Sequence, residues 1–366
     1  ATTEIYTILF VRQRQMCIRD SADPERTDAE RTDAPGPGDP ARAGAAGRGV
    51  LFLLAIAAGA TIPVQARLNG GLAERAGDPT QAAVVSFTAG LLLIAAIALA
   101  TPWGRRSLTA VRPALADGRV RWWYLLAGMV GGSMVLTQAL TVGVIGVAVF
   151  TVAVVAGQLI GGMTVDRLGL TPAGGRTLTP RRIAGAVLAL ASVALVVGPQ
   201  LADARGGPLW LLVALAPLAV GLATSGQQAL NARQAAAYGS IVPVTLINFV
   251  AGASALAVVH LAAVAVRGGG GVLPGPEHWW LYLGGPLGCL FIAVSAYLVP
   301  RVGAFLALLG LVCGKLLGSL AVDALAPAGG AGVTALTLVG TAGALAAAVL
   351  AAGGSRRSGP RPQLSR

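Results

Sequence analysis

Apolar residues occupy long stretches of this chain, and short segments rich in Gly, Pro and Arg separate them. A helix needs about 20 mainly apolar residues to cross the hydrocarbon core of a bilayer. Ten stretches reach or approach this length, at about 49–68, 80–101, 122–142, 146–166, 182–199, 208–228, 242–266, 279–299, 302–322 and 333–352. We therefore predict an all-α membrane protein with ten transmembrane helices.

The composition supports a membrane location. Of the 366 residues, 55% are hydrophobic and only 11% are charged, whereas about 25% of the residues of soluble domains are charged. This excludes a soluble enzyme and a disordered chain. The net charge of +12 raises the question of nucleic-acid binding. However, the basic residues lie between apolar stretches and form no basic face, so we expect the lipid bilayer as partner and no nucleic acid.

Arginines that flank the apolar stretches are unevenly distributed between the two sides of the membrane. With a cytoplasmic N-terminus, most of them fall on the cytoplasmic side, including Arg105, Arg106, Arg112, Arg119 and Arg121. The opposite side holds Arg67, Arg75, Arg205 and Arg267. Because cytoplasmic segments carry an excess of Lys and Arg, we predict that both termini are cytoplasmic, with residues 354–366 as a basic tail.

The N-terminal segment, residues 1–47, differs from the rest in composition, being rich in Pro, Gly, Asp and Arg. Residues 11–20 are similar to translated sequencing-adapter read-through. We therefore expect 1–47 to be either disordered or spurious, with a genuine flexible cytoplasmic tail as the alternative.

Rare residue types recur in the same order in the two halves of the chain. Gln65 and Asn69 match Gln227 and Asn231 at an offset of 162 residues. Beyond a shorter loop in the second copy the offset is 157, and it relates Trp122-Trp123 to Trp279-Trp280, Gln158 to Lys315, and Asp166 to Asp323. We predict two five-helix repeats, 48–201 and 202–353. Because five is odd, the second repeat enters the membrane from the opposite side, and such inverted repeats are typical of transporters.

The motifs P-x-Q-x-x-x-N at 63–69, F-x-A-G at 87–90 and G-Q-L-x-G-x-x-x-V-D at 157–166 resemble those of the YdcZ-type inner-membrane exporters of the drug/metabolite transporter superfamily. The resemblance covers about 48–353. It implies a ten-helix bundle in the bacterial plasma (inner) membrane and transport of small molecules, with efflux as the expected direction, but it supplies no substrate. The chain departs from the pattern at Lys315, where the motif has glutamine.

Lys315 is the only lysine in the chain and lies about seven residues inside the end of the ninth apolar stretch, or roughly 10 Å deep at 1.5 Å per residue. An intramembrane charge indicates function by default. The ammonium can attract an anionic substrate or release a proton. The alternatives are a side chain that extends to the outer interface and a lipid-facing position of no consequence. Its counterpart Gln158 can bind a polar substrate or a neighbouring helix.

Other polar residues form candidate gates and coupling groups. Gln65 and Asn69 share one helix face, as do Gln227 and Asn231, so each pair is either a substrate-binding gate or a polar cap where its helix leaves the membrane. Carboxylates are disfavoured at the C-terminal end of a helix. We therefore expect Asp166 and Asp323 either to pair with arginines or to bind a coupling ion.

The sequence therefore predicts a secondary transporter, in which rocking of two inverted repeats exposes a central site to each side in turn. The alternative is a non-transporting membrane scaffold or a membrane-embedded enzyme. No catalytic motif or phosphate loop is present in the sequence, and His260 and His278 lack metal-ligand spacing, so we expect no enzyme, cofactor or metal. With two fused repeats a monomer is sufficient, and a homodimer is possible.

Overall fold

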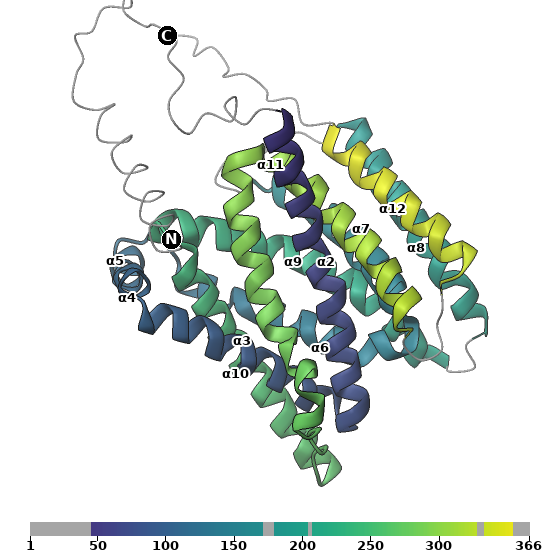
Figure 1. Cartoon of the computed structure of the whole chain (residues 1–366), viewed down its shortest axis with the longest axis horizontal. Coiled ribbons are helices and arrows are strands. Elements are labelled where there is room, and N and C mark those ends of the chain that lie inside the picture. Colours follow the sequence, from purple (N-terminus) through teal and green to yellow (C-terminus); the bar gives the residue numbers. More distant parts are fainter. Residues whose placement is uncertain (1–44, 171–178, 204–206, 328–332, 354–366) are drawn as a thin grey trace, which may run out of the picture. The chain divides into compact units, whose positions relative to one another are not determined.

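Figure 1 shows a computed structural model of the chain, which describes residues 45–170, 179–203, 207–327 and 333–353. The predicted tails, 1–47 and 354–366, lie outside these ranges, except that residues 45–47 begin the first described helix. The described helices are α2 (Ala45–Ala76), α3 (Pro79–Ala100), α4 (Pro102–Leu108), α5 (Val111–Ala116), η3 (Trp122–Ala127), α6 (Gly128–Ile145), α7 (Val147–Arg167), α8 (Pro180–Asp203), α9 (Gly207–Tyr238), α10 (Ile241–Arg267), η4 (Pro276–Leu283), α11 (Gly284–Leu325) and α12 (Ala335–Gly353).

The described part of the chain is helical and contains no strand. Eight of its helical segments are long and apolar enough to cross a membrane, and a shorter apolar helix spans Ala335–Ala351. Large apolar side chains such as Leu92, Val258 and Leu261 are about two-thirds exposed, as expected for positions that face lipid. The prediction of an all-α, multi-span membrane protein is therefore confirmed. The number of ten spans stays a prediction, although helix α9 covers the sixth predicted stretch.

Capping residues fix the helix boundaries at equivalent points of the two halves. Helix α2 ends before Gly77, which has φ +66°, and Asp78 caps α3 with Pro79 at its first position. In the second half, α9 ends before Gly239 with φ +65°, and Ser240 caps α10. Glycine after a helix and a side-chain oxygen at the next N-terminus are the usual signals for such a break.

Helix α11 contains both the eighth and the ninth predicted spans, and it reverses direction between them. The contacts of its glycines with α2 are Gly284 with Asn69, Gly288 with Gln65, Gly314 with Ile56, and Gly318 with Ala60. The first two contacts show that the first part of α11 runs antiparallel to α2, and the last two show that the second part runs parallel to it. Figure 1 shows this reversal at the label α11. Pro300, which cannot donate a helical backbone hydrogen bond, lies between the two parts.

Contacts between the two halves are reciprocal. In four cases, a contact between a residue of the first half and one of the second is repeated by the two equivalent residues. The paired contacts are Gly59–Leu311 with Gly221–Val154, Gly157–Leu218 with Gly314–Ile56, Gly90–Phe249 with Gly252–Phe87, and Gly128–Asn248 with Gly285–Ser86. In three of these four pairs of contacts, one residue is related to its equivalent by the offset of 162 and the other by the offset of 157. For Gly90–Phe249 and Gly252–Phe87, both residues are related by 162. Glycines at these positions let the helix backbones approach closely.

Helix α7 lies at the centre of the packing. Every residue from Val147 to Gly157 is buried, and α7 packs against α8, α9, α11 and α12. Apart from Phe150, small and β-branched residues make up this segment, and helices of both halves pack around it. The helix that carries Gln158 is therefore held firmly by elements of both halves.

Candidate functional site

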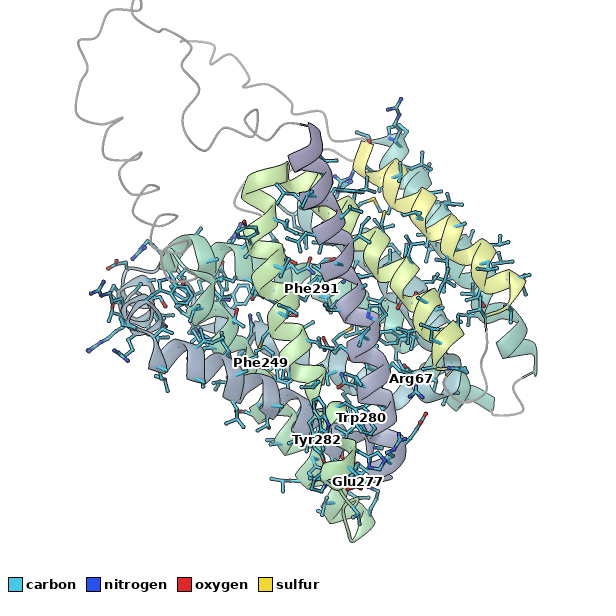
Figure 2. The ribbon with its side chains drawn as sticks, in the orientation of Figure 1. Arg67, Phe249, Glu277, Trp280, Tyr282 and Phe291 are labelled. Carbon is cyan, nitrogen blue, oxygen red and sulfur yellow. The ribbon has the colours of Figure 1, made fainter. Side chains whose placement is uncertain are left out.

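The side chains of Lys315 and Gln158, which occupy equivalent positions of the two repeats, meet in the interior. Lys315 Nζ donates a hydrogen bond to Gln158 Oε1 at 3.3 Å and lies 5.2 Å from the centre of the Phe291 ring. Only 8% of Lys315 is exposed. Figure 2 shows Phe291 on the first part of α11, beside α2. The ammonium is thus directed into the protein and not toward an exposed end of its helix.

Gln158 is held by a third helix. Its Nε2 donates to Thr224 Oγ1 of α9 at 3.3 Å, and its backbone carbonyl accepts from Ser225 Oγ at 2.9 Å. Thr224 in turn donates to the Gly221 carbonyl. The amide therefore uses its oxygen toward α11 and its nitrogen toward α9.

Close helix packing positions both side chains. Gly157 precedes Gln158 and lies against the Leu218 carbonyl of α9, and Gly314 precedes Lys315 and lies against the Ile56 carbonyl of α2. A Cβ at either glycine would overlap the opposing carbonyl oxygen. The same small-residue contact in each repeat therefore fixes the depth and rotation of the helix that carries the polar residue.

The two predicted amide pairs lie on α2 and α9, each near a glycine of the opposite half. Gln65 lies against Gly288, and Gln227 lies against the equivalent Gly131. Gln65 is buried, and its Oε1 has no hydrogen-bond partner among the described residues. These glutamines therefore occupy matching places in the interface between the halves.

The asparagines of these pairs bond differently in the two repeats. Asn69 Nδ2 donates to Gln138 Oε1 at 2.7 Å, whereas Asn231 Oδ1 accepts from Asn248 Nδ2 at 2.8 Å. Both bonds join helices within one repeat. No hydrogen bond of the described residues joins them to Lys315. The structure therefore brings Gln158 and Lys315 together and leaves the other candidates in separate contacts, and their role in binding or gating stays a prediction.

Asp166 and Asp323 have different partners. Asp166 forms an ion pair with Arg182 of α8, which is the arginine pairing that the sequence analysis held open. Asp323 accepts hydrogen bonds from the backbone N–H groups of Val147 at 2.9 Å and Ala148 at 2.7 Å, at the start of α7. The positive end of the α7 dipole favours this carboxylate. Both groups thus have structural partners, and a coupling role for either stays a prediction.

A charged cluster that the sequence analysis did not single out surrounds Asp78, between α2 and α3. This buried carboxylate accepts from Thr80 Oγ1 at 2.7 Å and from Arg267 Nη2 of α10 at 2.9 Å, and His260 Nδ1 lies 3.6 Å away. Burial alone raises the pKa of Asp78, but hydrogen bonds from Thr80, Gln81 and Arg267 outweigh it and hold the pKa at about 2, below its ordinary value of 3.8. The cluster ties the first half to the second.

Stability should depend on pH through this carboxylate. Because its pKa is lowered on folding, the contribution of Asp78 is fully present above pH 4 and is lost as the pH falls from about 4 to 2. We expect the melting temperature of Asp78→Asn to lie below that of the unsubstituted protein at pH 7, and the difference to shrink toward pH 2. Thermal unfolding of the two proteins in detergent, at pH 7 and near pH 2, measures this difference in melting temperature. A constant difference would show that ionisation of Asp78 does not contribute.

The described residues define a class of protein before any comparison. They form a multi-span helical membrane protein whose two halves meet through reciprocal glycine contacts and a buried polar pair. Within the described ranges, no group of three or more His, Cys, Asp or Glu side chains is placed to hold a metal ion.

Comparison with known proteins identifies the family. The family described as "Putative inner membrane exporter, YdcZ" matches residues 50–195 and 211–352, and the chain belongs to this family. Each matched segment falls entirely within one of the two predicted repeats. No curated protein and no solved structure matches the chain. The resemblance stated from the sequence motifs is thus confirmed, and the protein is a multi-span membrane protein of an exporter family.

Proposed function

We propose that this protein is a secondary transporter that exports small molecules across the inner membrane by alternating access of two inverted five-helix repeats. The observation that carries the proposal is the contact between Lys315 and Gln158, two equivalent residues that meet between the halves. A polar site shared by two related halves is the arrangement that lets a rocking motion expose one site to either side.

The reciprocal contacts support a two-fold relation between the repeats, because exchanging the halves reproduces the same pairs of residues. Equivalent positions that touch each other must lie close to such an axis. Gln158 with Lys315 is one such pair, and Phe87 with Phe249, whose ring centres are 4.7 Å apart, is another. With an odd number of spans in each repeat, the axis lies in the membrane plane.

On such an axis, Lys315 lies deeper in the membrane than its position near the end of the ninth apolar stretch implies. A residue on an axis in the membrane plane lies midway between the two surfaces, so Lys315 and Gln158 are equally far from both. An extension of Lys315 to the outer interface is incompatible with that depth and with its hydrogen bond to Gln158. In this proposal the pair is the central binding site.

Aromatic and basic residues support the orientation. Exposed tryptophans, Trp122 and Trp279 with their neighbours, occur at equivalent positions and suit the two membrane interfaces. The exposed arginines of α4, α5 and the segment up to η3 lie beside the first of these pairs; they are Arg105, Arg106, Arg112, Arg119 and Arg121. We assign that end to the cytoplasm, which places both termini there.

The inverted topology predicts opposite labelling of two equivalent residues. Glu74 and Ala236 are related by the 162-residue offset, and both are exposed near the ends of their helices. We expect a membrane-impermeant maleimide to label Glu74→Cys from outside intact cells and Ala236→Cys only in inside-out vesicles, because the two repeats cross the membrane in opposite directions.

The unsubstituted protein, with its own cysteines, is the background control for this labelling. If both variants react from the same side, the repeats are parallel and not inverted. That result would remove the in-plane axis and with it the central position of Lys315.

Transport itself is tested by expressing the full chain in bacteria and profiling small molecules in cells and medium by mass spectrometry. Empty vector is the control, and immunoblotting of membranes confirms insertion. Compounds that accumulate in the medium only with the protein would support export. An unchanged profile with confirmed insertion would contradict the proposal and favour the scaffold alternative.

A further inference from the structure

Lys315 has no acidic partner in the described structure. Every described acidic side chain is engaged elsewhere: Glu74 with Arg67, Asp78 with Arg267, Asp117 with Arg119, Asp166 with Arg182, Glu277 with His278, and Asp323 with the backbone N–H groups of Val147 and Ala148. The side chain of Asp203 lies outside the described residues. The described protein therefore supplies no negative charge to its one lysine.

Neutral groups surround the ammonium instead. It donates to the amide oxygen of Gln158, and the face of the Phe291 ring lies 5.2 Å away. An ammonium has three N–H donors, and one of them is used in this hydrogen bond. A buried charge without a counter-charge is costly, and intramembrane charges usually mark a substrate or ion pathway. An oxyanion from outside the protein would complete this environment.

We propose that the substrate carries an anionic group, a carboxylate or a phosphate, that binds between Lys315 Nζ and Gln158 Nε2. This proposal rests on the proposed transport function and names the substrate class for its site. The anion accepts a hydrogen bond from the ammonium and takes over the amide nitrogen that now donates to Thr224. Charge-assisted hydrogen bonds of this kind are about twice as strong as neutral ones.

The difference between the repeats gives the site its charge selectivity. Two glutamines would make a neutral, symmetric pair, whereas Gln158 with Lys315 places one positive charge where the halves meet. One buried positive charge favours the binding of a ligand group with one negative charge. It disfavours the binding of amines, because these are positively charged themselves. Because the pair lies where the halves meet, the same charge serves the site in both the inward-open and the outward-open state.

The experiment compares the full chain with Lys315→Gln and Arg106→Gln. The first variant removes the site charge and restores an amide pair; the second removes one charge from an exposed arginine on α4 and controls for net charge. Exported compounds are identified by mass spectrometry and sorted by charge. In parallel, the melting temperature of each purified protein is measured with sodium benzoate, sodium phosphate, sodium chloride or tetraethylammonium chloride at equal ionic strength.

We expect the exported compounds to be acids, and Lys315→Gln to reduce their export at least about tenfold while Arg106→Gln leaves it unchanged. Benzoate or phosphate should raise the melting temperature of the unsubstituted protein relative to chloride, and the rise should be absent in Lys315→Gln; the effective probe identifies the anion as carboxylate or phosphate.

Export of neutral or cationic compounds, or equal export of acids by Lys315→Gln, overturns the anion proposal and leaves transport standing. If no compound is exported, the proposal of transport is contradicted. The melting temperatures then test the anion site independently of transport. The anion proposal is then overturned if neither benzoate nor phosphate raises the melting temperature, or if the rise is equally large in Lys315→Gln.

Discussion

Replacing Gly157 by alanine should destabilise the protein far more than the same replacement five residues further along α7. A Cβ at Gly157 would overlap the Leu218 carbonyl oxygen and lie 2.8 Å from Leu222 N, both backbone atoms of α9. Backbone atoms cannot rotate away as a side chain can, so α7 and α9 must separate. Overpacking of a tight core costs about 1–3 kcal/mol, and we expect Gly157→Ala at the upper end of this range.

Gly162→Ala is the matched control, because nothing lies within 4 Å of a Cβ there. Both substitutions are in α7, so the gain in helix propensity from glycine to alanine is the same in each. The measurement is the free energy of unfolding in detergent. Equal stability of the two variants would show that the contact between α7 and α9 is loose.

Gly314→Ala extends the same test to the second repeat. Its Cβ would overlap the Ile56 carbonyl, as that of Gly157 overlaps the Leu218 carbonyl. A two-fold arrangement predicts similar losses for the two variants, since each separates one helix of one repeat from its neighbour in the other. A large loss at one position and none at the other would show that the halves do not pack reciprocally.

Much of this arrangement could be predicted from the sequence, because the membrane imposes a simple rule on helix length and the repeat supplies a second copy of each signal. Each predicted apolar stretch is helical in the structure, apart from a few residues at its ends, although the eighth and ninth stretches share helix α11. The short helices α4 and α5 were missed, because they lie in a polar, arginine-rich segment that carries no apolar stretch.

The contact between Gln158 and Lys315 could not be predicted, although both residues were candidates. A sequence offset states that two positions are equivalent, but not which equivalent helices cross closely enough to touch. That depends on which glycine faces which carbonyl, as at Gly157 and Gly314. The partner of Asp323 was missed for a related reason, because the start of α7 is brought to it by packing across the two halves.

Asp78 was overlooked because it breaks the repeat. Its equivalent in the second half is Ser240, which caps α10 but carries no charge. Asp78 therefore has no match among the rare residue types that recur in the two halves. Asymmetric positions such as Asp78 and Lys315 therefore distinguish the two halves chemically.

The second large effect is expected at Gln158. In Gln158→Leu, Lys315 loses the one hydrogen-bond acceptor that it has among the described residues, and its ammonium is left buried against apolar groups and the Phe291 ring. Hydrogen bonds to charged groups contribute about 1.5–3 kcal/mol, and a buried charge that has lost its partner costs more than the bond itself. We expect a loss of about 3 kcal/mol in the free energy of unfolding.

Lys315→Leu should have a much smaller effect on stability, because it removes the charge while Gln158 keeps its hydrogen bond to Thr224. The double variant should then recover most of the stability that Gln158→Leu loses, and the resulting cycle should give a coupling of about 2 kcal/mol between the two residues. Additive losses would mean that the ammonium does not depend on Gln158. A strong coupling would mean that the site holds a charge whose cost the amide oxygen of Gln158 reduces.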